Sequence, residues 1–423
     1  MGRLSRLTKQ FFQTSKSRVA ITAIGASFIA ATTSVSTFAS EANASYQLDW
    51  TFSTSTVASD LHKPWGIAAL DDDLFLITER DGKVRLWDNK NNTMSPADET
   101  FTDFVFESGQ GGMLDVLAHP NFAENNLVYL TYSAGHRLKN ATRLSTAEVV
   151  LQKDDNGMVT SFSLKNKRDI FTAQPFKAAT YHFAGRLVFM PDGTLVFGVG
   201  DGYTHMDKAQ TLDNHFGKVI RINDDGSVPA DNPYVEMAKK DDTIKPEIYS
   251  YGHRNPQGMY YDASRSVLFS NEHGPKGGDE INIIKPELNY GWPKITYGID
   301  YSGSEITPHS ALPEMQQPLV NWTPSIAPSS MLVYEGDLFP ALKGKLVNTS
   351  LKFQEIRVVE LKDKAKAAKK PVQQDYAKGP WQPANQWTFF KDQGERLRDI
   401  VETASGQLLI VTDSGKLIRL DKA

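Results

Sequence analysis

Of the nine histidines, His182 has the surroundings best suited to a general base. It comes directly before an expected strand that begins near Arg186, and Asp201 follows at the end of the next expected strand. Histidine changes charge near neutral pH, and a nearby carboxylate can fix its tautomer, so the pair has the composition of a proton-accepting unit. On these residues alone, a histidine that is only hydrogen-bonded in a loop is the more common situation.

Two short polar segments carry arginines that could recognise an anion. Segment 251–258 contains Arg254 and Asn255 beside a turn, a combination suited to an anionic or carbonyl-rich ligand. In segment 395–399, Arg396 and Arg398 are two residues apart and point to the same side if the chain is extended, so they could hold carboxylates together. The alternatives are side chains that tie strands together and a charged strand edge facing water.

Two glycine-rich segments could bring backbone groups close to a ligand. Segment 272–280 mixes acidic residues with glycines whose carbonyl oxygens could face a hard cation such as Ca²⁺, although its spacing is not that of an EF-hand. Segment 109–112 surrounds Gln110 with three glycines. A solvated acidic loop and a tight connection between strands are the simpler interpretations of the two segments.

The elements that must position these segments are strands that recur in one layout. An apolar strand, a turn, a second apolar strand, a polar loop with glycine and a third strand are expected in 65–87, 186–222, 258–284 and 397–420. Weaker copies lie near 114–164 and 331–361. About six units of this kind predict an all-β, six-bladed β-propeller, in which loops from several blades meet at one end of the central channel. A pair of β-sandwiches is the competing fold, but no linker divides the chain.

The N-terminal segment is typical of an export signal. Residues 1–18 carry five basic side chains and no acidic one, an apolar stretch follows, and small residues at 37–39 and 42–44 offer cleavage sites. We expect a signal peptide over 1–39, with the cut as late as 44, and the propeller over 45–423. Cleavage would make the formal net charge more negative than −4, which disfavours nucleic acid as a partner.

The predicted export signal indicates a periplasmic or secreted protein without a stable membrane anchor, because its apolar run is shorter than the ~20 residues that span a bilayer. The chain has no cysteine. Stability must therefore come from a broad core rather than from disulfides, and a cysteine nucleophile or a cysteine-based zinc site is excluded.

Taken together and in order, these segments resemble the soluble aldose (glucose) dehydrogenases that use pyrroloquinoline quinone, PQQ. The resemblance runs from about Pro64 to Leu420. It rests on GQGG at 109–112, GHRNPQG at 252–258, EHGPKGGDEIN at 272–282, NYGWP at 289–293, PSIAPSS at 324–330 and ERLRD at 395–399. It implies oxidation of an aldose at C1 to a lactone, with PQQ and Ca²⁺ as cofactors and an external electron acceptor that the sequence does not identify.

The resemblance also implies roles for particular residues. His182 would be the general base, with Asp201 beside it, and Arg254 and Asn255 would face the quinone oxygen. The remaining cofactor contacts would come from Gln110, Ser325, Lys352, Arg396 and Arg398, with Trp322 near the segment that contains Ser325. The main-chain carbonyls of Gly274 and Pro275 would ligate the calcium that binds PQQ, and Glu280 and Tyr290 resemble a second calcium site.

One departure from the family concerns the residues after the histidine. The family commonly has His-x-Gly-Gly-Arg where this chain has Ala184 in place of the first glycine, so the added methyl could shift the base or narrow the pocket. Two other functions are compatible with such a propeller: a calcium-dependent lactonase or related hydrolase, and a noncatalytic periplasmic binding protein. The cationic residues Lys352, Arg396 and Arg398 have no obvious task in the hydrolase.

Overall fold

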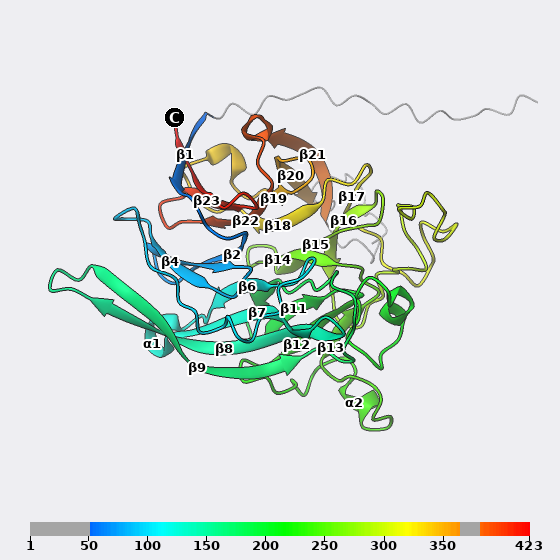
Figure 1. Cartoon of the computed structure of the whole chain (residues 1–423). Helices are drawn as coiled ribbons and strands as arrows, with labels where there is room; N and C mark the ends of the chain where they lie inside the picture. The colour runs from blue at the N-terminus through cyan, green and yellow to red at the C-terminus, as the bar shows by residue number, and fades with distance from the viewer. Residues whose placement is uncertain (1–50, 364–380) are drawn as a thin grey trace, which may run out of the picture. The chain divides into compact units, whose positions relative to one another are not determined.

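The computed structural model describes residues 51–363 and 381–423, so the expected signal peptide lies outside the described residues. Within these ranges the strands form six four-stranded antiparallel sheets (Figure 1). The first two sheets consist of β2 (Pro64–Ala69), β3 (Leu74–Glu79), β4 (Val84–Asp88) and β5 (Thr93–Met94), and of β6 (Met113–Ala118), β7 (Leu127–His136), β8 (Lys139–Lys153) and β9 (Val159–Thr172).

The next three sheets follow the same sequential order. They consist of β10 (Leu187–Phe189), β11 (Leu195–Val199), β12 (Lys218–Ile222) and β13 (Ile248–Tyr251); of β14 (Pro256–Asp262), β15 (Val267–Glu272), β16 (Asp279–Ile284) and β17 (Val320–Trp322); and of β18 (Pro328–Val333), β19 (Leu346–Ser350), β20 (Ile356–Asp363) and β21 (Trp381–Phe389). The helices of the described ranges are short: α1 (Phe122–Asn125), α2 (Val235–Ala238), and the 3-10 turns η1 (Met206–Gln210), η2 (Pro340–Leu342) and η3 (Lys391–Gln393). None of them is long and apolar enough to cross a membrane.

The sixth sheet joins the two ends of the described chain. It has the order β1-β24-β23-β22, in which β1 (Phe52–Ala58) pairs antiparallel with β24 (Leu417–Lys422), next to β23 (Leu408–Thr412) and β22 (Leu397–Glu402). Figure 1 shows β1, in blue, beside the red C-terminal strands. This pairing closes the ring, because the first strand completes a blade that the last three strands begin.

In five of the sheets, the strand that comes first in the chain faces the central channel. In the closing sheet, β22 is the strand that faces the channel. Each of these innermost strands contacts the next around the ring: β2, β6, β10, β14, β18 and β22, which returns to β2. The prediction of an all-β, six-bladed propeller is therefore confirmed. The N-terminal ends of the six strands meet at one end of the channel, and their C-terminal ends meet at the other.

The outer strands are the part of each blade that the sequence pattern missed. Strands such as β3 and β23 are buried along their whole length and read as apolar runs. The fourth strands are less regular: β5 has two residues, and β21 alternates between exposed and partly buried positions. A strand at the rim of a blade is covered on fewer sides, so its composition approaches that of a loop.

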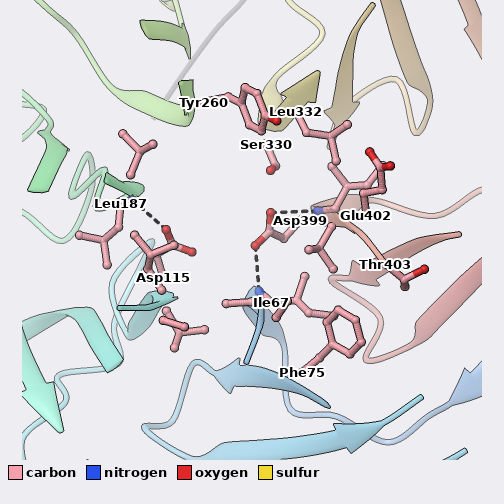
Figure 2. Close-up of a pocket in the computed structure, with 18 of the residues that line it drawn as sticks. Ile67, Phe75, Asp115, Leu187, Tyr260, Ser330, Leu332, Asp399, Glu402 and Thr403 are labelled. Carbon is pink, nitrogen blue, oxygen red and sulfur yellow. Dashed lines mark hydrogen bonds between the residues drawn. The ribbon is translucent and has the colours of Figure 1, made fainter. Parts of the chain in front are cut away.

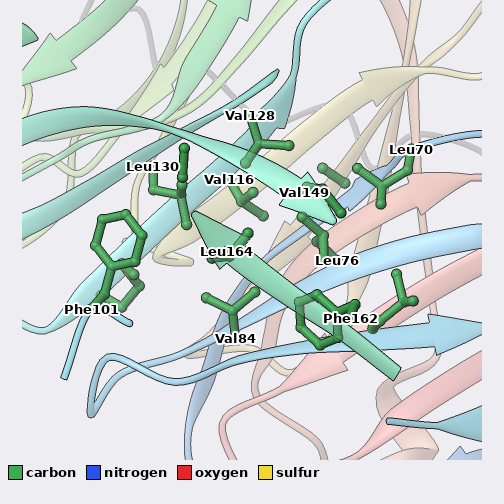
Figure 3. Close-up of a cluster of buried hydrophobic side chains, with 14 of the residues drawn as sticks. Leu70, Leu76, Val84, Phe101, Val116, Val128, Leu130, Val149, Phe162 and Leu164 are labelled. Carbon is green, nitrogen blue, oxygen red and sulfur yellow. The ribbon is translucent and has the colours of Figure 1, made fainter. Parts of the chain in front are cut away.

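Apolar side chains between neighbouring blades form the core. Figure 3 shows one such cluster, where Leu76 and Val84 from the first blade meet Val116, Leu130 and Leu164 from the second. All five side chains are buried. Similar clusters fill the other inter-blade spaces, so each sheet is buried on both faces by its neighbours.

The channel itself is crossed by a buried ionic cluster centred on Arg186. Its guanidinium lies 2.7 Å from Asp115 of β6 and 2.7 Å from Asp399 of β22, and it also donates to the main-chain oxygens of Gln257 on β14 and Ser329 on β18. The two carboxylates also accept backbone N–H groups of β10 and β2, which Figure 2 shows. One guanidinium therefore connects all six innermost strands.

We expect Arg186→Leu to lower the free energy of unfolding by about 3–5 kcal/mol, because it leaves Asp115 and Asp399 buried without their cation. Urea denaturation followed by tryptophan fluorescence measures the change. Arg419→Leu is the matched control, since the Arg419–Asp421 pair is partly exposed and its loss should cost about 1 kcal/mol or less. Equal losses in the two variants would contradict a central role for Arg186.

Candidate active site

A cavity of about 290 Å³ lies at the end of the channel where the innermost strands begin. Residues from all six blades line it, which explains how segments far apart in the sequence reach one site. The lining consists of Trp65, Arg80, Gly109, Gln110, Leu114, Phe183, Ala184, Asn255, Gln257, His273, Ala327, Leu351, Arg396, Arg398 and Asp413.

One wall of this cavity is flat and apolar. Trp65, Leu114 and Phe183 are buried and pack together as one cluster. The guanidinium carbon of Arg186 lies 4.4 Å from the ring centroid of Trp65, so the channel cluster supports the tryptophan through a cation–π contact. The wall is suited to a ligand with an apolar, planar body.

The cavity also carries a surplus of positive charge. Arg80, Arg396 and Arg398 line it together with a single carboxylate, Asp413. Asp413 accepts from Arg396 Nε at 2.9 Å and from Arg398 Nε at 3.0 Å, so the two arginines do lie on the same side, as their spacing predicts. Burial acts to raise the pKa of Asp413, but the two guanidiniums outweigh it and lower the pKa. Three cations against one anion indicate an anionic ligand.

His182 lies beside this cavity in a buried hydrogen-bond network. Its Nδ1 is 2.7 Å from Oδ1 of Asp201, and Trp292 Nε1 donates to the other carboxylate oxygen at 2.8 Å. The backbone N–H of Tyr203 also donates to Asp201. Asp201 holds Nδ1, and the imidazole Nε2 makes no hydrogen bond within the described residues.

The charge state of this pair follows from its surroundings. Burial lowers the pKa of His182 below its ordinary value, and the neighbouring Asp201 acts in the opposite direction without outweighing it. For Asp201, burial acts to raise the pKa, but His182 and Arg254 prevail and lower it. At neutral pH the pair is therefore a neutral imidazole held by an ionised carboxylate, which is the form required of a general base.

The backbone that carries His182 is held in an unusual conformation. His182 and Ala184 have φ values of 54° and 56°, in the left-handed region that costs an L-residue about 1–2 kcal/mol. Gln110 accepts from the His182 N–H at 2.9 Å, and the buried Lys177 Nζ donates to the carbonyls of Ala179 and Tyr181. Ala184, where the resemblance implies a glycine, keeps a positive φ and is one of the residues that line the cavity.

Arg254 and Asn255 carry buried polar atoms without partners. Arg254 Nη1 donates to the carbonyls of His273 and Gly274, at 3.1 and 2.6 Å, but its Nε has no hydrogen-bond partner in the described chain. Asn255 Oδ1, at the cavity wall, also has none. Buried polar atoms are normally satisfied, so these two indicate a place where a ligand completes the contacts.

The segment 272–280 is held from behind by Asp279. This buried carboxylate accepts from the Gly274 N–H at 2.9 Å, from the Ser325 hydroxyl at 2.6 Å and from the Ala327 N–H at 2.7 Å. Ser325 therefore faces Asp279 and does not line the cavity. Pro275 is buried, and its carbonyl oxygen accepts no hydrogen bond from the described residues.

Glu280 and Tyr290 do not contact each other through a hydrogen bond in the described structure. Glu280 shares the Asn282 amide with Glu272, each carboxylate oxygen lying 3.0 Å from its nitrogen. Burial, with Glu272 adding to it, raises the pKa of Glu280 to about 8. The Tyr290 hydroxyl donates to the Ile283 carbonyl at 2.6 Å, and its ring stacks on His253.

The structure thus brings most of the predicted residues to one end of the channel. Gln110, Asn255, Arg396 and Arg398 line the cavity. His182 and Arg254 contact lining residues directly, Gly274 follows the lining residue His273, and Asp201 is held behind His182. Lys352 is exposed, and its amino group lies nearest the ring of Phe353. Within the described ranges, no three acidic or histidine side chains are grouped closely enough to hold a metal ion.

Two charged residues of the cavity were missed from the sequence. Arg80 follows β3 in a charged turn and donates to the carbonyls of Gly109 and Gly111, and Asp413 occupies the equivalent turn after β23. Their sequence context, a polar residue before a glycine, is that of an ordinary solvated hairpin turn. Only closure of the ring, which places the first and last blades side by side, brings Arg80 close to Arg398.

Known proteins that share this propeller include oxidoreductases. The family model described as Glucose / Sorbosone dehydrogenase matches residues 61–419, and the chain belongs to this family. It is 35% identical over 377 residues to the aldose sugar dehydrogenase YliI of Escherichia coli, covering 88% of this chain and 93% of that protein. It is 28% identical over 279 residues to quinoprotein glucose dehydrogenase B of Acinetobacter calcoaceticus, covering 62% of this chain and 56% of that protein.

Solved structures share the architecture. The soluble aldose sugar dehydrogenase of Escherichia coli in its apo-form aligns with a TM-score of 0.75 at 33% identity, over 88% of this chain and all of that one. The PQQ-bound aldose sugar dehydrogenase of Streptomyces coelicolor aligns with a TM-score of 0.65 at 23% identity, over 88% of this chain and 98% of that one, and shows the common fold. The chain is a propeller-type member of the Glucose / Sorbosone dehydrogenase family.

We expect the His182 imidazole to stay neutral at pH 6.5, the ordinary midpoint of histidine, and to gain its proton only at lower pH, because burial lowers its pKa. Asp201→Asn should lower this pKa further, since the negative charge that favours the imidazolium is lost. NMR of ring-labelled histidine measures both values, with the signal assigned by its absence from His182→Gln.

The lowered pKa of His182 also makes the free energy of unfolding depend on pH. Since the folded pKa lies below the unfolded one, acidification below about pH 6.5 protonates the unfolded chain first and reduces the free energy of unfolding. His182→Gln should lose less stability over that range than the parent. A midpoint above 6.5 in the folded protein would contradict the neutral base.

Proposed function

We propose that this protein oxidises aldose sugars at C1 to the lactone, with PQQ and Ca²⁺ as cofactors and an external electron acceptor. The observation that carries the proposal is the cavity of about 290 Å³ with three arginines and one carboxylate, directly beside the buried His182–Asp201 pair. Membership of the sugar dehydrogenase family supports it, as does the name quinoprotein given to one relative. The expected signal peptide places the reaction in the periplasm or outside the cell.

The residues of the cavity fit PQQ in charge and shape. PQQ is a planar tricarboxylate, so it requires cations for its carboxylates and an apolar surface for its rings. Arg396, Arg398 and Arg80 supply the cations, and Trp65 with Phe183 supplies the surface. The unpartnered Asn255 Oδ1 supplies a polar contact at the cavity wall, and Arg254, with its unpartnered Nε, lies next to it in the chain. When bound, the quinone accepts the hydride that leaves the sugar.

Main-chain oxygens of the 272–280 segment fit a calcium ion beside the cofactor. Calcium prefers oxygen ligands, including backbone carbonyls. The Pro275 carbonyl is without a donor, and the Gly274 carbonyl accepts one hydrogen bond from Arg254 and keeps a second lone pair. The second calcium that the resemblance implies would lie at Glu280 and Tyr290. The Glu280 carboxylate accepts from the Asn282 amide, and the Tyr290 hydroxyl donates to the Ile283 carbonyl.

His182 performs the proton transfer in this proposal. Its Nδ1–H donates to Asp201, so the lone pair on Nε2 accepts the proton of the anomeric hydroxyl as C1 is oxidised. The imidazolium that forms is stabilised by the adjacent carboxylate, as in other histidine–aspartate pairs. Trp292 and the Tyr203 N–H keep Asp201 in place and ionised, and Gln110 with Lys177 fixes the loop that aims the ring.

We expect the purified exported protein to oxidise aldoses with an artificial electron acceptor only when PQQ and Ca²⁺ are both added. The reason is that the cationic cavity and segment 272–280 supply contacts for the cofactors but contain no redox group of their own. Activity with calcium alone toward a lactone would instead identify the hydrolase alternative, and activity with NAD would exclude the proposal.

A matched pair of variants tests the cofactor site in the same assay. Arg398→Ala should weaken PQQ binding by on the order of 1.5–3 kcal/mol, because a charge-assisted contact is lost. Arg168→Ala, an exposed arginine outside the cavity, should leave PQQ binding unchanged. Calorimetric titration measures both affinities, and equal affinities in the two variants would mean that the Arg396–Arg398 pair is a surface feature.

We expect His182→Gln to lower kcat by about 10²–10⁴ while PQQ affinity stays near that of the parent, because the imidazole moves a proton and holds no carboxylate. In the parent, kcat should fall at low pH as His182 becomes protonated, and the variant should lack this acid limb. Wild-type turnover in the reconstituted variant would show that His182 is structural.

A further inference from the structure

A second and larger cavity, of about 860 Å³, lies at the other end of the channel (Figure 2). It is lined by the middle and C-terminal parts of β2, β6, β10, β14, β18 and β22 and by the turns that follow some of them. Arg186 and its two carboxylates form its inner boundary, and the Trp65 wall separates it from the candidate active site. The sugar dehydrogenase chemistry proposed above makes no use of it.

The charge of this cavity is opposite to that of the active site. Six carboxylates line it and Arg186 is its single cation. Two carboxylates, Asp115 and Asp399, are buried at the inner end. The other four belong to the turns and strand end at the mouth, namely Asp71, Asp72, Glu335 and Glu402.

The inner end lacks one positive charge. Asp115 and Asp399 both lie 2.7 Å from the same Arg186 nitrogen, so two carboxylates share one guanidinium. Such a buried cluster keeps a net negative charge unless a proton or a cation enters. Burial, together with Asp399, raises the pKa of Asp115 to about 7 against the effect of Arg186, in keeping with this deficit.

A hydroxyl next to this cluster faces the cavity without a hydrogen-bond partner. Ser330 is 3% exposed, and its hydroxyl makes no hydrogen bond in the described part of the chain, although its backbone groups are paired. Figure 2 shows its oxygen directed into the cavity, toward Asp399. The hydroxyl oxygen opens onto the cavity, so it is available to a ligand that carries a hydrogen-bond donor.

Apolar residues of the innermost strands border the cavity between the two acidic ends. They include Val116, Leu187, Met331, Val333 and Ile400, whose side chains also pack in the inter-blade clusters. A hard metal ion does not suit this surface, and within the described ranges no three acidic side chains are placed to ligate one. The surface suits a ligand with an apolar middle and a positive charge at each end. Asp399 and Glu402 are three residues apart on β22, so their backbones are about 10 Å apart along the strand, and the Glu402 carboxylate also accepts the Glu335 N–H at 2.9 Å.

We propose that this end of the channel binds a linear aliphatic diamine in its diammonium form. One ammonium group donates to the Ser330 hydroxyl and supplies the missing charge beside Asp399 and Asp115. The methylene chain lies along the apolar walls, and the second ammonium group meets Glu402 and its acidic neighbours at the mouth. The bound ligand joins innermost strands of several blades, so it stabilises the closed ring.

Calorimetry with octamethylenediamine tests the proposal on the purified protein without added PQQ, at low salt. We expect one molecule to bind per chain and to raise the melting temperature. Octanediol, which has the same length and no charge, should bind at least about tenfold more weakly, because it cannot supply the missing cation. Octylamine should bind with intermediate affinity. Equal binding of diamine and diol, or no binding of the diamine, would overturn the proposal.

Three variants locate the site. Ser330→Ala should weaken diamine binding by about five- to tenfold, and Glu402→Gln by about threefold, since Glu402 is closer to solvent. Glu314→Gln, an exposed glutamate that lines neither cavity, is the matched control and should bind like the parent. Melting curves without ligand check that the variants fold.

Two further outcomes would overturn the assignment. Diamine affinity that is equal in the parent, Ser330→Ala and Glu402→Gln would place the ligand elsewhere. Displacement of the diamine by an equal concentration of Ca²⁺ would show an inorganic cation site. Because the proposed active site lies beyond Arg186, Arg398→Ala should leave diamine binding unchanged, so this test and the PQQ test fail independently.

Discussion

The interaction on which the rest of this structure depends is the sharing of one buried guanidinium by the innermost strands of the propeller. Arg186 reaches Asp115, Asp399 and two main-chain carbonyls, and its carboxylate partners hold the backbone of the two strands that remain. Apolar packing between blades gives most of the stabilisation but little direction, since it is roughly proportional to buried area. Hydrogen bonds to fixed donors and acceptors are directional, so the cluster sets the ring's registration at its centre.

The same cluster connects the scaffold to the candidate site. Arg186 lies under the ring of Trp65, which forms the apolar wall of the smaller cavity, and only three residues separate it from His182. The chain turns sharply here, with positive φ at 182, 184 and 185. The turn lets His182 lie at the channel mouth and Arg186 inside the channel, although they are only four residues apart in the sequence. This is the physical reason for Gly185 at this place, and His182 and Ala184 meet the same requirement at some cost in strain.

The two ends of the channel carry opposite charges. Three arginines surround the cavity at one end and four carboxylates surround the mouth of the other, with Arg186 and its two acids between them. The arginine-lined end therefore favours anions, and the carboxylate-lined end favours cations. The Arg186 cluster between them is buried, so solvent screens its charges little. An anionic cofactor and a cationic ligand can occupy such a protein without competing.

The sequence by itself determined the repeated strands, and through them the six-bladed ring, because apolar runs and glycine turns are local signals. It also predicted site residues that the structure places at or beside the smaller cavity, namely His182, Asp201, Gln110, Asn255 and the Arg396–Arg398 pair, since each stands next to a strand and belongs to a motif. It did not reveal Arg80, Asp413 or Ser330, whose local contexts are those of ordinary turn and strand residues, and Lys352, for which it predicted a cofactor contact, lies outside the lining of the cavity. Only the tertiary structure decided which side chains share a cavity, because ring closure places the first and last blades side by side and so joins charges more than 300 residues apart in the chain.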